Sequence, residues 1–150
     1  MSTSKRIGHY VVSTHWDREW YEPFQDYRFR LVKLLDEVLD TMKTDPGFKF
    51  FQMDGQVITI EDYLEIRPER ETEIRELAQS GRLKLGPWYV LPDEFLVSGE
   101  SIIRNLQMGL RLAQRFGEPS RAGFLCDMFG HISQMPQILR GFGIDNAFLW

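Results

Sequence analysis

The residues with the clearest chemical character are His15 and Asp17, which stand two positions apart near the beginning of the chain. In an extended segment, residues i and i+2 point to the same side, so the imidazole and the carboxylate converge. Zinc accepts both ligand types. Because the pair alone also fits a hydrogen-bonded surface contact, a metal site needs a third ligand. Asp127 is the candidate, since it follows an apolar stretch and precedes a turn-like Phe-Gly-His sequence.

Three other residues with metal-binding or nucleophilic side chains have structural interpretations. His131 is a further candidate ligand, but it also fits a histidine that is hydrogen-bonded near the start of the next helix. His9 lies inside the first predicted strand and is expected to face away from the site, in a structural role. Cys126 is predicted to be a buried core thiol rather than a nucleophile, and a single cysteine excludes a disulfide framework.

Aromatic side chains accompany these polar residues. Trp20, Trp88, Tyr89 and Phe129 lie in or beside the same predicted loops. They could cap the hydrophobic core, or they could offer flat apolar faces on which a sugar ring stacks. The residues alone leave both interpretations open.

Alternating strand-like and helix-like patterns predict the elements that position these side chains. Segments rich in β-branched and aromatic residues predict strands over residues 7–13, 48–53, 82–85, 122–126 and 146–150. Apolar residues at helical spacing predict helices over residues 26–42, 56–66, 68–81 and 133–140. One more helix is predicted to be capped by Ser98 and to end before Gly117.

This order of elements predicts an α/β fold with a parallel sheet and right-handed crossovers, either open or closed into a barrel. In such folds the loops after the carboxyl ends of the strands form the functional site. Acidic and histidine residues follow the first four predicted strands, namely His15, Asp17, Asp54, Asp93, Glu94 and Asp127. The pattern therefore predicts that these side chains gather at one edge of the sheet.

The composition narrows the function classes. The 150 residues are 43% apolar and 13% aromatic, unlike a disordered chain. A net charge of −4 without a long Lys/Arg cluster argues against a nucleic-acid-binding protein. No apolar run approaches the roughly 18 residues of a membrane span, and residues 1–8 do not resemble a signal peptide. We expect a cytoplasmic protein that binds neither nucleic acid nor membrane, and homo-oligomer formation stays open.

The chain ends inside the last predicted strand, which is apolar and is followed by no closing helix. An uncovered hydrophobic edge strand is a liability in a complete domain. We therefore expect residues 1–150 to be the N-terminal part of a larger parallel α/β domain whose remaining strands are absent. The alternative is a complete small domain with residues 146–150 at the edge of its sheet.

Three motifs, in order, make the chain similar to a known enzyme family. They are HWDREW at residues 15–20, GPWY at 86–89 followed by PDE at 92–94, and CDMFGH at 126–131 followed by QMP at 134–136. Together they resemble glycoside hydrolase family 38, the α-mannosidases, over essentially the whole chain. The HWDREW form is similar to the bacterial members, including the mannosylglycerate hydrolases. The family's aspartate motif usually reads Asp-Pro-Phe-Gly-His, and Met128 replaces its proline here.

Carried over by position, the resemblance implies that His15, Asp17 and Asp127 bind one zinc ion. Asp127 would also be the catalytic nucleophile, and Trp20 and Phe129 would line the mannose subsite. The resemblance further implies a seven-stranded α/β barrel, followed by helical and β-sandwich domains. The family's fourth zinc ligand and its acid/base aspartate lie beyond residue 150, so this segment alone is predicted to be inactive.

The activity that the resemblance implies is zinc-dependent hydrolysis of α-mannosides or mannose-containing oligosaccharides, with retention and a covalent intermediate on Asp127. Two alternatives remain. A metal-dependent polysaccharide deacetylase would use similar ligands to activate water. A carbohydrate-binding module would use Trp20, Trp88 and Tyr89 as a stacking platform, and its sugar binding would not depend on a metal.

Overall fold

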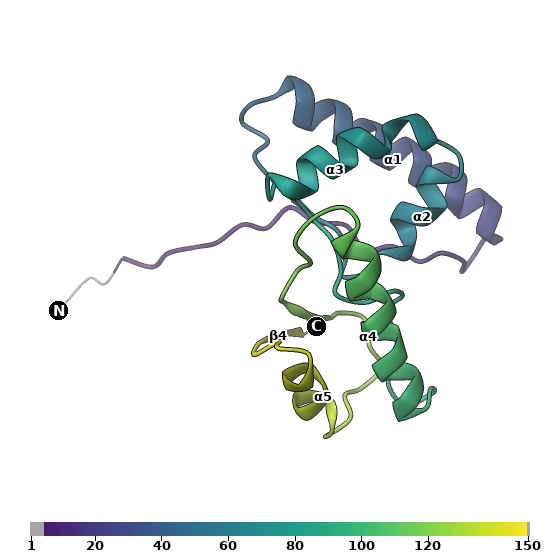
Figure 1. Ribbon diagram of the computed structural model, residues 1–150, viewed down its shortest axis with the longest axis vertical. Coiled ribbons are helices and arrows are strands. Elements are labelled where there is room, and N and C mark those ends of the chain that lie inside the picture. The colour runs from purple at the N-terminus through teal and green to yellow at the C-terminus, as the bar shows by residue number, and fades with distance from the viewer. Residues whose placement is uncertain (1–4, 150) are drawn as a thin grey trace.

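The computed structural model describes residues 5–149 and shows a mixed α/β chain with short parallel sheets (Figure 1). The helices are α1 (Phe24–Thr44), α2 (Ile58–Leu64), α3 (Glu71–Gln79), α4 (Gly99–Gln114) and α5 (Met135–Gly141), with a 3₁₀ turn, η1 (Pro68–Arg70), before α3. The strands are β1 (Phe51–Gln52), β2 (Leu83–Lys84), β3 (Gly123–Leu125) and β4 (Ala147–Leu149). The predicted α/β class is confirmed.

Helices α1, α2 and α3 form one group, at the top of Figure 1. α1 buries an apolar stripe at helical spacing that includes Leu31, Leu35, Leu39 and Met42. These side chains share a core with residues of β1, β2 and the end of α4. Each buried leucine contributes about 2 kcal/mol to the free energy of folding. This core therefore holds β1 and β2, the strands that precede the loops of the site.

A second core lies between α4, β3 and α5. The Oγ of Ser98 accepts a hydrogen bond from the backbone N–H of Ser101 at 3.1 Å, which confirms the predicted cap of α4. Within α4, Gly109 lies so close to the backbone of Pro87 and Trp88 that a Cβ would come 2.2 Å from both. Glycine is therefore required where α4 crosses the segment that follows β2.

All strand pairing is parallel among the described residues. β1 pairs with β2, and β3 pairs with β4 in a separate two-stranded sheet. An isolated parallel bridge between Ser13 and Gln52 places the segment before His15 beside β1. A second bridge joins Gln56 to Trp88. The chain that follows Ser13 and the chain that follows β1 therefore leave on the same side.

The predicted strand over residues 7–13 is wrong except at its end. Ser13 forms the bridge, and the carbonyl of Val12 accepts a hydrogen bond from the N–H of Gln52 at 2.9 Å. Within the described part of the chain, residues 5–11 form no ladder and extend away from the rest (Figure 1). The side chains of residues 7–11 favour a strand, but a ladder also needs a neighbouring strand along its whole length, and β1 is only two residues long.

The other predicted strands exist but are shorter. The segments over residues 48–53, 82–85, 122–126 and 146–150 each contain a strand of two or three residues. Trp150, at the end of the last predicted strand, lies outside the described residues. Isolated pairs of strands do not support long ladders, because each has an open edge on at least one side.

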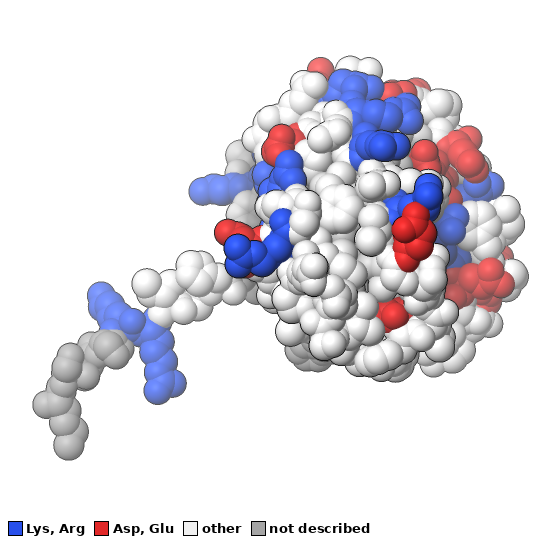
Figure 2. Space-filling model, turned by 60° about the horizontal axis from the view of Figure 1, so that its bottom comes forward, with Lys and Arg blue, Asp and Glu red and all other residues white. Residues whose placement is uncertain are grey.

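The surface mixes charges of both signs. On the face shown in Figure 2, basic and acidic side chains are interspersed. Contacts such as that between Glu71 and Arg75 of α3, with Oε1 and Nη2 2.6 Å apart, are surface ion pairs. Within residues 5–149, no helix combines the length and the apolar character needed to cross a membrane.

Candidate active site

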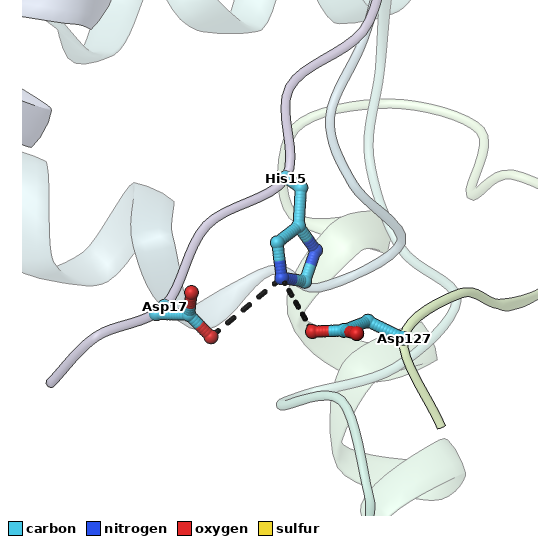
Figure 3. A group of neighbouring side chains, drawn as sticks. All are labelled: His15, Asp17 and Asp127. Carbon is cyan, nitrogen blue, oxygen red and sulfur yellow. Dashed lines mark ion pairs between the residues drawn. The ribbon is translucent and has the colours of Figure 1, made fainter. Parts of the chain in front are cut away.

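Three side chains from two separate segments converge at one point (Figure 3). His15 and Asp17 follow the Ser13 bridge, and Asp127 lies two residues after β3. The Nε2 of His15 lies 3.1 Å from Oδ2 of Asp127 and 3.6 Å from Oδ1 of Asp17. One ligand atom from each residue lies within 4.8 Å of the other two. The structure thus brings together the three residues that the sequence predicted as metal ligands.

The donor set and its spacing are compatible with a divalent cation such as zinc. Ligand atoms at about 2.0–2.2 Å from zinc stand roughly 3.4 Å apart at tetrahedral angles. The separations of 3.1 and 3.6 Å from the imidazole nitrogen bracket that value. A neutral imidazole and two carboxylates also balance the charge of a divalent cation. Among the described residues, these three supply three of the four positions of a tetrahedral site.

The backbone at Asp127 turns sharply. Its φ is +59°, in the left-handed region that most non-glycine residues avoid. Aspartate tolerates this region better than most residues, because its short polar side chain can bond locally. Such residues are concentrated at functional sites, where the surrounding structure holds them. The turn ends the strand direction of β3 and brings the carboxylate toward His15 (Figure 3).

The peptide groups of Trp16, between the first two candidate ligands, are bonded on both sides. Its N–H donates to Oδ2 of Asp54 at 2.7 Å, and its carbonyl accepts from Nε2 of Gln56 at 2.6 Å. Nε2 of Gln56 also donates to Oδ2 of Asp54 at 2.8 Å. Asp54 and Gln56 are buried and follow β1. The loop after β1 therefore holds the segment that carries His15 and Asp17.

Asp54 is a fully buried carboxyl group beside this site. Burial raises the pKa of Asp54 to about 6, while hydrogen bonds from Gln56 and Trp16 and the electrostatic influence of His15 oppose the rise. Its Oδ1 has no hydrogen-bond partner among the described residues. An unpaired buried oxygen costs free energy, so this atom calls for an explanation.

The loop beyond Asp127 is held by Glu94, whose side chain is 0% exposed. Oε1 of Glu94 lies 2.9 Å from Nδ1 of His131, and Oε2 accepts a hydrogen bond from the N–H of Ile132 at 2.8 Å. His131 therefore has the hydrogen-bonded position that was its alternative to metal binding. Glu94 ties the loop after β2 to the loop that carries Asp127.

A hollow of about 600 Å³ opens beside the three candidate ligands. Its lining includes all three of them together with Arg18, Asp93 and Phe129. Arg18 forms a bidentate ion pair with Asp62, in which Nε donates to Oδ2 at 2.7 Å and Nη2 donates to Oδ1 at 2.8 Å. The volume is in the range of small-molecule sites. A second hollow of about 520 Å³, lined in part by Trp20, adjoins His15 and Asp127.

Two predicted substrate-binding aromatic residues are accessible at these hollows. Trp20 is 64% exposed and stacks on Tyr21, with ring centroids 4.2 Å apart. Phe129 is 81% exposed. Neither side chain caps a core in the described structure, so both present aromatic faces beside the candidate ligands.

The other two aromatic candidates do not form a stacking platform. Trp88 is 0% exposed, and its Nε1 donates to the carbonyl of Phe124 at 2.7 Å. Tyr89 is partly buried against the first core, and its hydroxyl donates to Oε2 of Glu61 at 3.0 Å. The core-cap interpretation is confirmed for Trp88, and the platform of Trp20, Trp88 and Tyr89 is wrong because Trp88 is inaccessible.

Two structural predictions for single residues need correction. Cys126 is half-buried and lines both hollows, rather than lying in the core. Its burial and the nearby carboxylates of Asp54 and Asp127 raise the pKa of its thiol, which disfavours the nucleophilic thiolate. His9 lies exposed on the extended N-terminal segment, so the structural role inside a strand is wrong.

The supporting residue Gln56 was not predicted from the sequence. Its position two residues after Asp54 is the only sequence signal, and that signal is weak because a buried glutamine and a surface glutamine look alike in sequence. Glu94 was recognised as a residue that follows a strand, but its partners His131 and Ile132 are 37 and 38 residues away. Such contacts depend on the tertiary fold.

Comparisons with known proteins identify the family. The model of the glycosyl hydrolases family 38 N-terminal domain matches residues 6–150. A protein of Halalkalibacterium halodurans named "Putative mannosylglycerate hydrolase" is 48% identical over 144 residues, covering 95% of this chain and 16% of that protein. An α-mannosidase of Saccharomyces cerevisiae is 34% identical over 139 residues, covering 91% of this chain and 13% of its own.

A solved structure shows the same relationship. An α-mannosidase from Enterococcus faecalis superposes with a TM-score of 0.89 and 41% sequence identity, covering 93% of this chain and 16% of that one. The chain described here spans between 13% and 16% of the length of these relatives. It belongs to glycoside hydrolase family 38.

Proposed function

We propose that this member of glycoside hydrolase family 38 forms the N-terminal part of the catalytic domain of a zinc-dependent, retaining α-mannosidase. The observation that carries the proposal is the convergence of His15, Asp17 and Asp127 within 4.8 Å in a chain of this family. The substrates would be α-mannosides or mannose-containing oligosaccharides, in agreement with the names of the relatives.

The rest of the domain belongs to the proposal as well. We infer a seven-stranded α/β barrel in which further strands join the two short parallel sheets. The fourth zinc ligand and the acid/base residue would lie outside residues 1–150. Support comes from the small share of each relative that this chain covers, 13–16%. We place the enzyme in the cytoplasm, and homo-oligomer formation stays open.

The candidate ligands divide the work at the site. Nε2 of His15 and one oxygen each of Asp17 and Asp127 would hold the zinc ion. When bound, zinc supplies Lewis-acid attraction for hydroxyl groups of the mannose ring. Trp20 and Phe129 would place aromatic faces against the C–H face of the same ring, which restricts its orientation.

Asp127 would also act as the nucleophile. One carboxylate oxygen attacks the anomeric carbon, and the new C–O bond forms as the bond to the aglycone oxygen breaks. The acid residue outside this chain donates the proton that the leaving oxygen needs. Water then attacks the same carbon, gives its proton back to the residue that protonated the leaving oxygen, and releases the Asp127 carboxylate, so two inversions give net retention. This geometry requires the second carboxyl group about 5–5.5 Å away.

A fluorinated mannosyl reagent tests the nucleophile in the full-length protein. Intact mass should show a stable adduct, and peptide mapping should place it on Asp127. Asp127→Asn should abolish labelling and turnover, while zinc binding weakens only in part. Asp93→Asn, which removes another carboxylate from the same hollow, is the matched control and should still be labelled on Asp127. A label on Asp54, Asp93 or Glu94, or an inverted product, would contradict this mechanism.

The same experiment separates the alternatives. A deacetylase would form no mannosyl adduct and would instead release acetate from acetylated sugars. A carbohydrate-binding module would bind mannosides equally well after treatment with a chelator. The burial of Trp88 already argues against the stacking platform on which that module would depend.

A further inference from the structure

We propose that Asp54 is a positioning residue for the candidate metal site. One of its carboxylate oxygens fixes the backbone between His15 and Asp17, and the other accepts the imidazole N–H of His15 when a cation binds the opposite ring nitrogen. The inference rests on the proposed function, because it concerns the support of the proposed zinc ligands.

The first part follows from the hydrogen bonds of Trp16. The N–H of Trp16 donates a hydrogen bond to Oδ2 of Asp54 at 2.7 Å, and the carbonyl oxygen of Trp16 accepts one from Nε2 of Gln56 at 2.6 Å. The peptide groups on either side of Trp16 are therefore both fixed, which sets the directions of the side chains before and after it. Because Asp54 and Gln56 are buried, water does not compete for these bonds, and they hold the segment firmly.

The second part follows from the free oxygen of Asp54. Oδ1 is buried and has no partner among the described residues. Figure 3 shows Nε2 of His15 facing both carboxylates, with the other ring nitrogen turned away from them. A histidine that binds a metal through one nitrogen donates a hydrogen bond from the other, usually to a carboxylate or a carbonyl. Asp54 is the nearby candidate, because its Oδ2 already bonds the N–H of Trp16, the residue next to His15.

The turn that carries Asp54 also touches the opposite half of the site. Gly55 has a φ of +89°, and a Cβ there would lie 2.6 Å from Cβ of Phe124. The absence of a side chain lets the turn pack directly on β3, which leads to Asp127. Asp54 therefore lies in a turn that contacts both ligand-bearing segments. A change at Asp54 should also shift the segment of His15 and Asp17 relative to the segment of Asp127.

Zinc affinity of the full-length protein tests the inference without an activity assay. Competition with a chromophoric chelator should show about 10- to 100-fold weaker zinc binding in Asp54→Asn, the usual cost of losing such a partner. The asparagine keeps the size of the side chain and one acceptor oxygen, but it loses the charge and the second acceptor. Asp36→Asn is the control, because Asp36 bonds Tyr63 and Arg67 away from the site, and it should bind zinc like the wild type.

A double-mutant cycle distinguishes positioning from a general structural role. In a His15→Ala background, Asp54→Asn should weaken zinc binding by a much smaller factor than it does in the wild type, because its second contact is gone. Equal factors in both backgrounds would overturn the role through His15. If Asp54→Asn fails to fold, the zinc affinity of Gln56→Met is measured instead, because this variant removes the amide that bonds the carbonyl of Trp16. We expect a several-fold loss, and unchanged affinity would overturn the inference.

The outcomes for the wild type keep the two proposals apart. If the wild-type protein binds zinc and Asp54→Asn binds it equally well, the positioning role alone is overturned. If the wild-type protein binds no zinc, the proposed metal centre fails and the positioning role fails with it.

Discussion

The two segments that supply the candidate ligands are built differently. Around Trp16, both neighbouring peptide groups are bonded to buried side chains, so His15 and Asp17 are held from within the fold. Asp127 sits exposed on a left-handed turn, and the buried Glu94 holds its loop only four and five residues further on. The first segment is held by hydrogen bonds next to the candidate ligands themselves, and the second is held by a contact farther along the chain.

This difference suits the proposed division of roles. His15 and Asp17 would only hold the cation, so rigid support favours affinity. Asp127 would hold the cation and also attack the sugar, so the exact placement of its loop should affect turnover more than metal binding. Changes in the two segments should therefore separate zinc affinity from catalysis.

The largest effect is expected from the first segment, which carries His15 and Asp17. His15→Ala removes the nitrogen ligand and should strip most of the zinc and nearly all activity from the full-length enzyme. Because the side chain is partly exposed and makes no core contacts, the melting temperature of the metal-free protein should change little. Metal analysis and thermal melting measure the two quantities. Stoichiometric zinc in the variant would remove His15 from the site.

The support of the second segment should show the opposite balance. Glu94→Ala leaves the N–H of Ile132 and a ring nitrogen of His131 without their partner, at a cost of about 1–3 kcal/mol in stability. A shift of the Asp127 loop should lower kcat by up to about 100-fold. Zinc affinity should fall much less than in His15→Ala. Glu94→Gln keeps one acceptor and should lie between the wild type and Glu94→Ala.

Steady-state kinetics and chelator competition on the same protein samples check this balance. A variant that loses zinc as completely as His15→Ala would show that the Asp127 loop is as important for binding as the first segment, and the contrast between the two segments would disappear.

The pH dependence of stability is a further way to sharpen the contrast, because it concerns only the buried support of the first segment. Burial raises the pKa of Asp54 in the folded protein to about 6, above the ordinary aspartate value of 3.8. The folded protein therefore holds the proton more tightly than the unfolded chain, which stabilises it below about pH 4. This stabilisation is lost as the pH rises toward 6, at about 1.4 kcal/mol per pKa unit, or roughly 3 kcal/mol in total.

Thermal melting of the metal-free full-length protein between pH 4 and pH 7 measures the effect. The asparagine of Asp54→Asn does not titrate. As the pH rises from 4 to 7, the free energy of unfolding of the wild type should therefore fall relative to that of the variant. Added zinc should reduce the change, because a nearby cation favours the ionised carboxylate. A difference that does not vary with pH would contradict the raised pKa.

The sequence predicted the helices of this fold better than its strands. Regular apolar spacing and the Ser98 cap located α1 and α4, because these signals act within one element. Residues 7–11 have strand-like side chains, yet they form no ladder among the described residues, because pairing depends on neighbours that are distant in sequence.

The site shows the same limit. His15, Asp17 and Asp127 were predicted from their residue types and from motif resemblance, and they converge in the structure. Their supports could not be predicted in the same way. Whether Gln56 or Glu94 is buried against another loop depends on contacts between residues 37 to 40 positions apart.

Trp20 gives the finest comparison between the segments, because it continues the segment of His15 and Asp17 into the exposed hollow. The indole is 64% exposed and stacks on Tyr21, so it contributes little to the core. A sugar ring that covers its face would gain about 1–3 kcal/mol in the transition state, which corresponds to roughly 5- to 150-fold in kcat/KM. Trp20→Ala should lower kcat/KM by such a factor and leave zinc affinity unchanged.

Phe29→Ala is the matched control for this prediction, because Phe29 is a 62% exposed aromatic residue on α1 that lines neither hollow. Both variants should melt within a few degrees of the wild type, since neither side chain is buried, but only Trp20→Ala should lose turnover. If Trp20→Ala instead lost stability and kept normal kinetics, the indole would serve packing. In that case Trp20 would not contact the mannose ring, and only residues of the Asp127 segment would recognise it.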